Sequence, residues 1–492
     1  MMRVVQYNGD GYKFEFIGVF EVFAHPRKLL RVSSCEYPYK LKFETINKYN
    51  LKEFVMSSYK RKKTFGDTDW FVHDRFGMFI HFGIYALPAR HEWIKNRESI
   101  SEEKYQKYFD HFDPDMLDCK EWARQAREAG MKYVVMTTKH HDGFCLFDTK
   151  YTDYNVMNTP YGKDIIKEYV DAFRAEGLKI GFYYSLIDWH HPDFPIDKHH
   201  PRRFDSNAEE LDRGRDVRKY ARYMRDQVSE LMTNYGKIDI MWFDFSYGEM
   251  ENAPEWMQFG GAKGKDQWEA EELIALTRSF NPDIIINNRT QIPQDIITPE
   301  QYEYASFEPP IENGEYITWE TCHTFSGSWG YSREERSWKT PKMLIDILVK
   351  TVARGGNLIM NVGPNARGYL DDRAENALRT YADWMRYNSR SIYGCTKAEP
   401  EFVAPNGTVF TQSEDGKRLY VHLVDYAFYR LNLDIDADRI DYMQLLSDGS
   451  ELLYEGRNFY GPDGTLTGKY VSVNMSEFAF KDIDPVIEIF LK

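Results

Sequence analysis

One pattern of apolar and polar positions recurs between about residue 65 and residue 365. An apolar stripe with helical spacing is followed by a glycine, and then by a short apolar run that ends in polar side chains. The clearest copy has its glycine at Gly130 and its apolar run at residues 133–136, and the next two copies have Gly177 and Gly236. Because glycine suits the left-handed position that ends a helix, the pattern predicts helices that alternate with strands.

Helices and strands in alternation predict a parallel sheet. Besides the strand at 133–136, we expect strands at residues 76–83, 180–184, 238–243, 284–286 and 358–360. That many parallel strands favour a (β/α)8-like barrel of the TIM type over an open sheet, although the sequence does not show eight clearly. In such barrels the active site lies at the carboxyl ends of the strands. The polar residues at these expected ends are His81, His140, His141, Asp244, Arg289 and Asn361.

The two ends of the chain follow a different pattern. After about residue 395, short apolar runs are separated by Asp, Gly and Asn turns, which predicts an antiparallel β-sandwich. The first 60 residues are rich in strand-forming residues but give no indication of function. We therefore expect a strand-rich N-terminal extension of unknown role at 1–60, a catalytic α/β barrel at 61–394 and a C-terminal β-sandwich at 395–492.

Composition narrows the classes of partner. With 42% hydrophobic and 28% charged residues, this chain of 492 residues has the make-up of a soluble protein with more than one domain. Its net charge of −14 argues against a nucleic-acid partner, because an excess of Lys and Arg is needed to neutralise phosphates. The same charge disfavours an anionic membrane surface. No stretch of the sequence reaches the roughly 18 consecutive apolar residues of a membrane span.

The N-terminal residues and the cysteines bear on the compartment. Residues 1–8 contain no apolar run followed by a small-residue cleavage site, so we expect no signal peptide. The five cysteines are scattered and lack the spacing of metal ligands, which predicts free thiols in a reducing cytoplasm. We therefore expect a cytoplasmic protein, whose oligomeric state, monomer or homo-oligomer, the sequence leaves open.

The sharpest candidate for chemistry is Asp244, which directly follows an apolar run. At the mouth of a barrel such a carboxylate faces a ligand; the alternatives are a helix cap or a structural ion pair. Glycoside chemistry needs a second carboxyl group, because one group attacks or stabilises the anomeric carbon while the other protonates the leaving oxygen. The downstream candidates, which spacing alone does not rank, are Glu300, Glu303, Glu308, Glu312, Glu315 and Glu320.

The sequence His140-His141-Asp142 is the second chemical feature. A neutral imidazole offers one donor and one acceptor, which suits paired sugar hydroxyls, but His and Asp are also metal ligands. Adjacent residues leave a strand on opposite faces, so both histidines could hold one ion only if the chain bends there. We expect no metal, and a metal-dependent hydrolase remains an alternative.

Two further segments place a carboxylate beside an indole. They are His91-Glu92-Trp93 and Trp319-Glu320-Thr321. Each fits a sugar subsite, in which the ring stacks on an apolar sugar face, and each equally fits a core Trp next to a surface Glu.

Taken together, several segments resemble glycoside hydrolase family 29, the α-L-fucosidases. Each is weak by itself, but the ordered set across about residues 65 to 400 is specific, and the β-rich tail resembles the C-terminal domain of the family. The segments are 75–83 (RFGMFIHFG), 139–144 (KHHDGF), 242–244 (WFD), 287–289 (NNR), 298–300 (TPE), 328–331 (SWGY) and 355–364 (GGNLIMNVGP).

The resemblance implies a retaining exo-α-L-fucosidase that releases terminal α-L-fucose from oligosaccharides or glycoconjugates by double displacement, without a cofactor. It implies that Asp244 is the nucleophile. The position of the acid/base residue varies within the family; Glu300 is our choice, with Glu320 and Glu308 in reserve. The residues that the resemblance places around the fucose are His81, Glu92, Trp93, His140, His141, Tyr184 and Arg289.

The sequence departs from the family pattern at three positions. Phe82 stands where Trp is usual, Phe245 where Gly often follows the nucleophile, and Asn288 where Asp is frequent. These differences bear on the preferred leaving group more than on the reaction. Two alternatives on the same fold are a non-catalytic fucose-binding protein and a barrel glycosidase that acts on another sugar.

Overall fold

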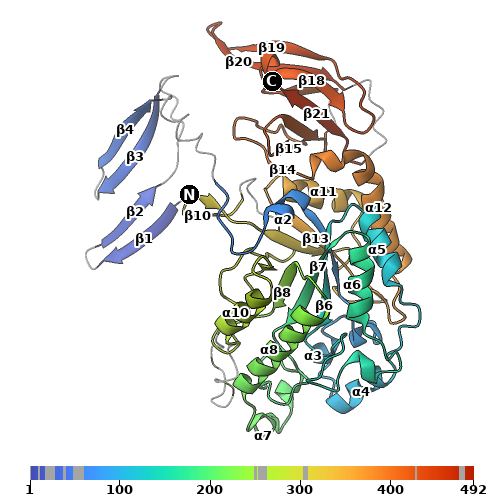
Figure 1. Cartoon of the computed structure of the whole chain (residues 1–492). Helices are drawn as coiled ribbons and strands as arrows, with labels where there is room; N and C mark the ends of the chain where they lie inside the picture. The colour runs from blue at the N-terminus through green and yellow to red at the C-terminus, as the bar shows by residue number, and fades with distance from the viewer. Residues whose placement is uncertain are drawn as a thin grey trace. The chain divides into compact units, whose positions relative to one another are not determined.

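The computed structural model describes residues 60–248, 252, 257, 263–302, 309–426, 429–475 and 483–492 in full, and only the backbone of four strands before residue 60. The chain divides into two units, Met1–Lys60 and Arg61–Lys492. The first unit holds two antiparallel hairpins (Figure 1). Their strands are β1 Met2–Asn8, β2 Gly11–Phe16, β3 Lys28–Glu36 and β4 Lys40–Asn47.

The second unit is built on a parallel sheet of seven strands in the order β12-β13-β5-β6-β7-β8-β9. The strands are β5 Phe76–Ile80, β6 Tyr133–Lys139, β7 Lys179–Ser185, β8 Ile240–Asp244, β9 Ile285–Ile286, β12 Glu320–Thr324 and β13 Asn357–Val362. A small hairpin, β10 Ile311–Glu312 with β11 Glu315–Tyr316, precedes β12.

The eighth barrel position is occupied by an irregular segment, residues 296–300. It forms isolated parallel bridges to both edges of the sheet: Ile296 pairs with Asn287 beyond β9, and Glu300 pairs with Cys322 of β12. Pro299 lacks a backbone N–H, which keeps this segment from forming a regular ladder. The predicted TIM-like barrel is therefore present, with seven regular strands and one broken one.

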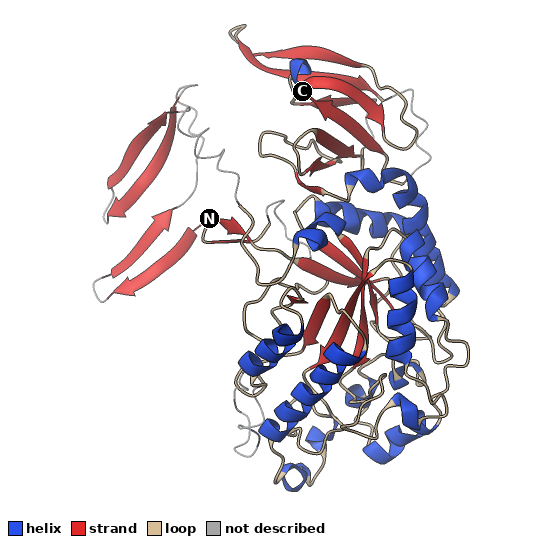
Figure 2. Cartoon of the chain, viewed as in Figure 1, coloured by secondary structure: helices blue, strands red, loops and turns tan. Residues whose placement is uncertain are grey.

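Amphipathic helices cover the outside of the barrel (Figure 2). Asp118, Asp164 and Asp216 each accept a backbone N–H bond at the start of a helix, as N-cap residues do. The α-helices are α2 Asp69–Asp74, α3 Ile94–Arg97, α4 Glu102–Asp110, α5 Cys119–Glu128, α6 Ile165–Ala175, α7 Ala208–Asp212, α8 Val217–Asn234, α10 Ala270–Phe280, α11 Pro341–Val352 and α12 Asp372–Asn388. Short 3-10 turns lie at η1 Ile84–Ala86, η2 Val156–Asn158, η3 Pro201–Phe204, η4 Ser389–Ser391 and η5 Ala437–Arg439.

Alternate residues of the strands belong to two separate hydrophobic cores. One set packs under the helices and includes Met241, Phe243 and Tyr184. The other set fills the inside of the barrel and includes Ile240, Trp242 and Tyr183, with Phe71 of α2. Since successive strand residues point to opposite faces, position along the strand decides which side chains reach the interior.

The C-terminal part is a sandwich of two antiparallel sheets around one core of mainly aliphatic side chains. The first sheet has the order β14-β15-β16-β21-β18 and the second the order β17-β20-β19. The strands are β14 Cys395–Lys397, β15 Val409–Ser413, β16 Arg418–His422, β17 Arg430–Leu433, β18 Ile440–Leu445, β19 Tyr454–Tyr460, β20 Leu466–Asn474 and β21 Val486–Leu491. This architecture confirms the predicted fold class, barrel and sandwich.

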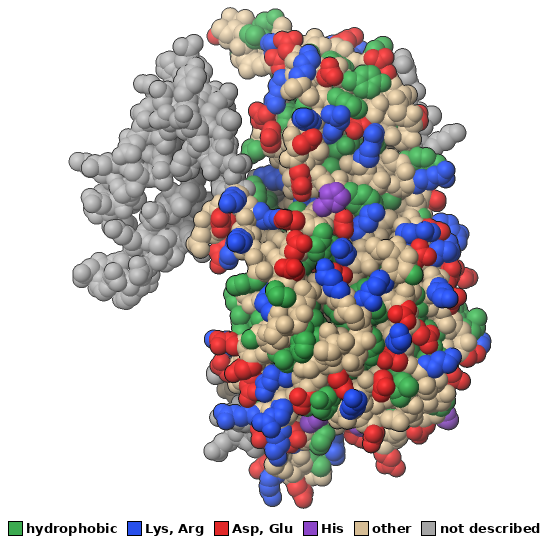
Figure 3. All heavy atoms as spheres, in the orientation of Figure 1, with side chains coloured by type: hydrophobic (Ala, Val, Ile, Leu, Met, Phe, Trp, Pro, Cys, Tyr) green, Lys and Arg blue, Asp and Glu red, His purple; other side chains and the backbone are tan. Residues whose placement is uncertain are grey.

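The surface carries both charges in mixture. On the face drawn in Figure 3, acidic and basic side chains are interspersed, with hydrophobic atoms scattered between them. Among the described helices, none combines the length and apolar character that a membrane span requires.

Gly77 of β5 tests the packing of the barrel interior. A Cβ at this position would lie 2.3 Å from the ring of Tyr133, which is fully buried. Gly77→Ala is therefore expected to cost about 1–3 kcal/mol of unfolding free energy through overpacking. Urea unfolding followed by circular dichroism measures the change. Gly248→Ala is the control, because a Cβ there meets nothing within 4 Å; equal midpoints for both variants would contradict the packing described.

Candidate active site

The carboxyl ends of the strands meet around one pocket. Its empty volume, with open solvent at the mouth included, is about 380 Å³. The floor consists of buried side chains, and the rim of partly exposed ones. The lining residues are Phe79, His81, Glu92, Trp93, His140, His141, Tyr183, Trp242, Asp244, Phe245, Arg289, Glu300, Cys322 and Trp329.

Asp244 lies at the end of β8 and is 8% exposed. Its Oδ1 accepts a hydrogen bond from Arg289 Nη1 at 2.7 Å, and its Oδ2 accepts one from Tyr183 Oη at 2.8 Å. His141 Nε2 lies 4.0 Å from Oδ2. A cation and a hydroxyl donor thus each contact one oxygen of this carboxyl group.

Arg289 connects Asp244 to a second carboxyl group. The same Nη1 that bonds Asp244 lies 3.1 Å from Glu300 Oε2. The two bonded carboxylate oxygens are therefore no farther apart than the sum of these distances, about 6 Å. The guanidinium is also placed over the indole of Trp242, 4.5 Å from the ring centroid.

The histidines of the floor are neutral. Burial lowers the pKa of His81 to about 3 and lowers the pKa values of His140 and His141 well below the ordinary value. Ser185 donates its only hydroxyl proton to Ile187 O, so the 2.7 Å contact with His141 Nδ1 requires the proton to be on that nitrogen. The Nε2 atom of His141 is then an acceptor.

His81 has the same tautomer. Asn361 Nδ2 donates to Trp329 O at 2.7 Å, which leaves Asn361 Oδ1 as the acceptor for His81 Nδ1 at 2.7 Å. His81 Nε2 is therefore also an acceptor. The pocket offers two neutral imidazole acceptors to the hydroxyl groups of a ligand.

Glu92 supplies a further acceptor. It is 1% exposed, its Oε2 accepts a bond from the Gly330 backbone N–H at 2.8 Å, and burial raises its pKa to about 7. His91 Nδ1 lies 3.1 Å from Oε1, but this nitrogen already accepts the Trp93 N–H and its pKa is lowered to about 4 by burial, so the contact is not an ion pair. Glu92 Oε1 consequently has no protein donor.

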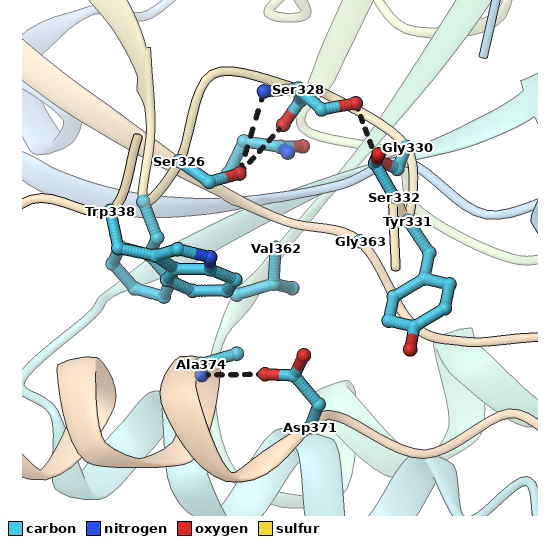
Figure 4. Close-up of a pocket in the computed structure, with 12 residues that line it drawn as sticks. Ser326, Ser328, Gly330, Tyr331, Ser332, Trp338, Val362, Gly363, Asp371 and Ala374 are labelled. Carbon is cyan, nitrogen blue, oxygen red and sulfur yellow. Dashed lines mark hydrogen bonds between the residues drawn. The ribbon is translucent and has the colours of Figure 1, made fainter. Parts of the chain in front are cut away.

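A loop that includes residues 328–330 holds Glu92 directly and holds His81 through Asn361. Figure 4 shows a small second cavity that this loop also lines, together with Ser326, Trp338 and Asp371 at the start of α12. Ser328 Oγ donates to Gly330 O at 2.8 Å and so closes the loop on itself. The backbone of this loop supplies the N–H that binds Glu92 and the carbonyl that orients Asn361.

The structure places nearly all the sequence-predicted residues at the pocket: His81, Glu92, Trp93, His140, His141, Asp244, Arg289 and Glu300. Tyr184 is the exception. Its hydroxyl donates to Gln227 at 2.8 Å under helix α8, because Tyr184 points to the helical side of β7. Its neighbour Tyr183 points inward and reaches Asp244 instead.

The reserve candidates for the second carboxyl group have different positions. Glu320 is 1% exposed at the beginning of β12, where it accepts hydrogen bonds from Tyr133 Oη at 2.5 Å and Trp242 Nε1 at 3.3 Å. Burial raises its pKa to about 7. It does not line the pocket, because the start of a barrel strand lies at the opposite end from the mouth. Glu308 lies outside the described residues.

Sequence reasoning missed several lining residues, among them Phe79, Trp242 and Cys322. Strand alternation could have found the first two, since Phe79 precedes His81 by two positions and Trp242 precedes Asp244 by two. Within the described residues, no group of three or more His, Cys, Asp and Glu side chains has an arrangement that could hold a metal ion.

Comparison with known proteins gives one consistent result. The α-L-fucosidase family model matches residues 47–390. The α-L-fucosidase of Dictyostelium discoideum is 29% identical over 354 residues, which cover 66% of this chain and 71% of that protein. The structure of α-L-fucosidase isoenzyme 1 from Paenibacillus thiaminolyticus is 42% identical, with a TM-score of 0.77 over 86% of this chain and 98% of that one.

A second similar structure is that of a family 29 α-L-fucosidase from Bacteroides thetaiotaomicron, trapped as a covalent intermediate with 2-fluoro-fucosyl fluoride. It is 25% identical, has a TM-score of 0.71, and covers 88% of this chain and 99% of its own.

Proposed function

Since the chain belongs to glycoside hydrolase family 29 and is a retaining α-L-fucosidase, we propose that Asp244 is its nucleophile and Glu300 its acid/base residue. The family assignment confirms the predicted reaction. It decides against the two alternatives, a fucose-binding protein without catalysis and a barrel glycosidase that acts on another sugar. The observation that supports the two roles is the position of Arg289, which contacts both carboxyl groups through one nitrogen. A retaining mechanism needs two carboxyl groups close together, ~5–5.5 Å apart.

The reaction proceeds in two displacements. Asp244 attacks the anomeric carbon, while Glu300 gives its proton to the departing glycosidic oxygen. Water then attacks the fucosyl–Asp244 ester; Glu300 removes a proton from this water, and the carboxylate of Asp244 leaves. The Tyr183 hydroxyl and Arg289 orient Asp244 for attack, because each is bonded to one of its oxygens. No cofactor takes part in these steps.

The floor of the pocket recognises the sugar. The Nε2 acceptors of His81 and His141 and the unpartnered Oε1 of Glu92 match the hydroxyl groups of a fucose ring. His140 has a buried Nδ1 without a partner and adds a further polar contact. The aromatic side chains of the floor, Phe79 and Trp242 among them, form the apolar surface for the 5-methyl group.

The substrates are terminal fucose residues of oligosaccharides or glycoconjugates. The barrel interior below the pocket is filled by packed side chains, so only the end of a glycan enters. The four cysteines in the described part of the chain are free and buried, which fits a reducing compartment and supports a cytoplasmic location.

Asp244→Ala is expected to lower kcat/KM for an aryl α-L-fucoside by at least about 10³-fold, because the nucleophile is lost. Azide should restore turnover by taking the place of the carboxylate, and it should give β-L-fucosyl azide, the inverted product. Nuclear magnetic resonance of the product determines its anomeric configuration. Unchanged turnover, or an α-configured azide product, would remove Asp244 from this role.

Glu300→Ala is expected to lower kcat/KM about 10²–10⁴-fold for substrates whose leaving group needs a proton. The loss in kcat/KM should be much smaller for a dinitrophenyl fucoside. Azide should now attack the intermediate on Asp244 and give α-L-fucosyl azide. Glu312→Ala is the matched control, since Glu312 is exposed and bonded to Lys62. Glu320→Gln tests the reserve candidate; rescue of this variant by azide, and none for Glu300→Ala, would transfer the role to Glu320.

Tyr183→Phe and Tyr184→Phe form a matched pair on one strand. Removal of the Tyr183 hydroxyl takes away a donor to the ionised Asp244, so kcat/KM should fall about 10–100-fold while the melting temperature stays close to wild type. Tyr184→Phe leaves Gln227 without its donor, so it should lower the melting temperature and change kcat/KM by only a few fold. Equal kinetic effects of the two variants would contradict the assignment of Tyr183.

A further inference from the structure

Phe245, the residue after Asp244, has an unusual backbone for an aromatic residue. Its φ is 83°, in the left-handed region that favours glycine. The sequence thus keeps a large side chain at a position whose conformation suits a glycine. A conformation of this kind persists only where neighbouring contacts enforce it, and residues in such conformations cluster at active sites and ligand clamps.

The ring of Phe245 contacts several other aromatic rings. Its centroid lies 5.1 Å from that of Trp93, 5.1 Å from that of His141 and 5.1 Å from that of His199. Tyr247 lies 5.6 Å away. The ring of Phe245 is therefore fixed in position and is partly exposed, unlike the aromatic rings of the floor.

A buried ion pair fixes the chain behind Phe245. Lys263 Nζ lies 3.1 Å from Asp197 Oδ2, both side chains are fully buried, and the Tyr247 hydroxyl donates to the same oxygen. Tyr247 and Lys263 also exchange backbone hydrogen bonds at 2.9 and 3.0 Å. These contacts tie the chain after β8, two residues beyond Phe245, to the loop after β7.

The position of Phe245 relative to the sugar follows from the shape of the pocket. The floor is closed by the barrel core, so a leaving group can extend only through the mouth. The partly exposed aromatic residues of that mouth include the contacting pair Trp93 and Phe245, and exposed Glu300 also belongs to the rim. The leaving group on its way out meets the acid/base residue and this aromatic pair.

We infer that Phe245, supported by Trp93, forms a leaving-group subsite that selects substrates with a flat apolar face next to the fucose. Suitable faces are an aryl ring or the C–H face of a second pyranose, both of which stack on aromatic side chains. The inference rests on the proposed function, in which Asp244 attacks from the floor. It makes Phe245 a specificity-determining residue of the same site.

The test compares two substrates that share the fucose and differ in the leaving group: 4-nitrophenyl α-L-fucoside and α-L-fucosyl fluoride. Fluoride is a single atom and does not reach the subsite. Phe245→Gly removes the ring and suits the backbone, whereas Phe245→Ala removes the ring and keeps the left-handed strain; Phe245→Tyr keeps the ring. In both ring-less variants, the ratio of kcat/KM for aryl fucoside to that for fluoride should fall about tenfold, the size of one aromatic contact. Phe245→Tyr should keep the ratio.

Other outcomes overturn the inference in distinguishable ways. An equal loss of kcat/KM for both substrates in Phe245→Gly would mean that the residue only positions Asp244. A matching rise in the inhibition constant of free fucose would put the ring in the fucose subsite. If the wild type turned over neither substrate, the proposed function would fail. The subsite would then be tested by calorimetry, as the ratio of the affinities for the aryl fucoside and for fucose; an unchanged ratio in Phe245→Gly would refute it.

Discussion

The site depends on the placement of Arg289 between two carboxyl groups. One nitrogen of Arg289 lies within hydrogen-bond distance of both Asp244 and Glu300, whose bonded oxygens are therefore no more than about 6 Å apart. The guanidinium is itself held by Thr298, through Nε to the hydroxyl and Nη2 to the carbonyl, both at 3.1 Å. Thr298 and Glu300 belong to the irregular segment that completes the barrel. The segment that closes the barrel therefore also carries Glu300 and holds Arg289 in place.

The barrel interior supports Arg289 from below. The guanidinium stacks on Trp242, and the indole N–H of Trp242 donates to Glu320, which also accepts the Tyr133 hydroxyl. Gly77 leaves the space that the Tyr133 ring occupies. Glu320 has a raised pKa of about 7 because it is buried, yet its contacts are those of a support and not of a group facing substrate. A buried carboxyl with a shifted pKa marks a candidate for catalysis, and geometry decides whether it can act.

Most of the site could be predicted from the sequence because a parallel barrel collects its strand ends at one face. Polar residues after apolar runs, such as His81 and Asp244, follow that rule directly. Tyr183 and Tyr184 could not be separated without the register of β7, since adjacent residues point to opposite faces. The eighth barrel position was hidden because its segment has only isolated bridges and contains Pro299. Glu320 follows a Trp, as expected of a sugar subsite, but it lies at the wrong end of its strand.

Burial affects the titratable groups of the pocket differently, according to the hydrogen-bond partners that each group has. Asp244 receives a guanidinium and a hydroxyl, one on each of its oxygens, which compensate for the loss of water. Glu92 receives the Gly330 N–H but no cation, and its pKa rises to about 7. The histidines lose their charge altogether, since burial lowers their pKa values and the protons they keep are directed to Asn361 and Ser185. The same pocket thus holds a carboxyl group bonded to a cation beside uncharged imidazole acceptors, and the difference comes from one arginine and from hydrogen bonds made outside the pocket.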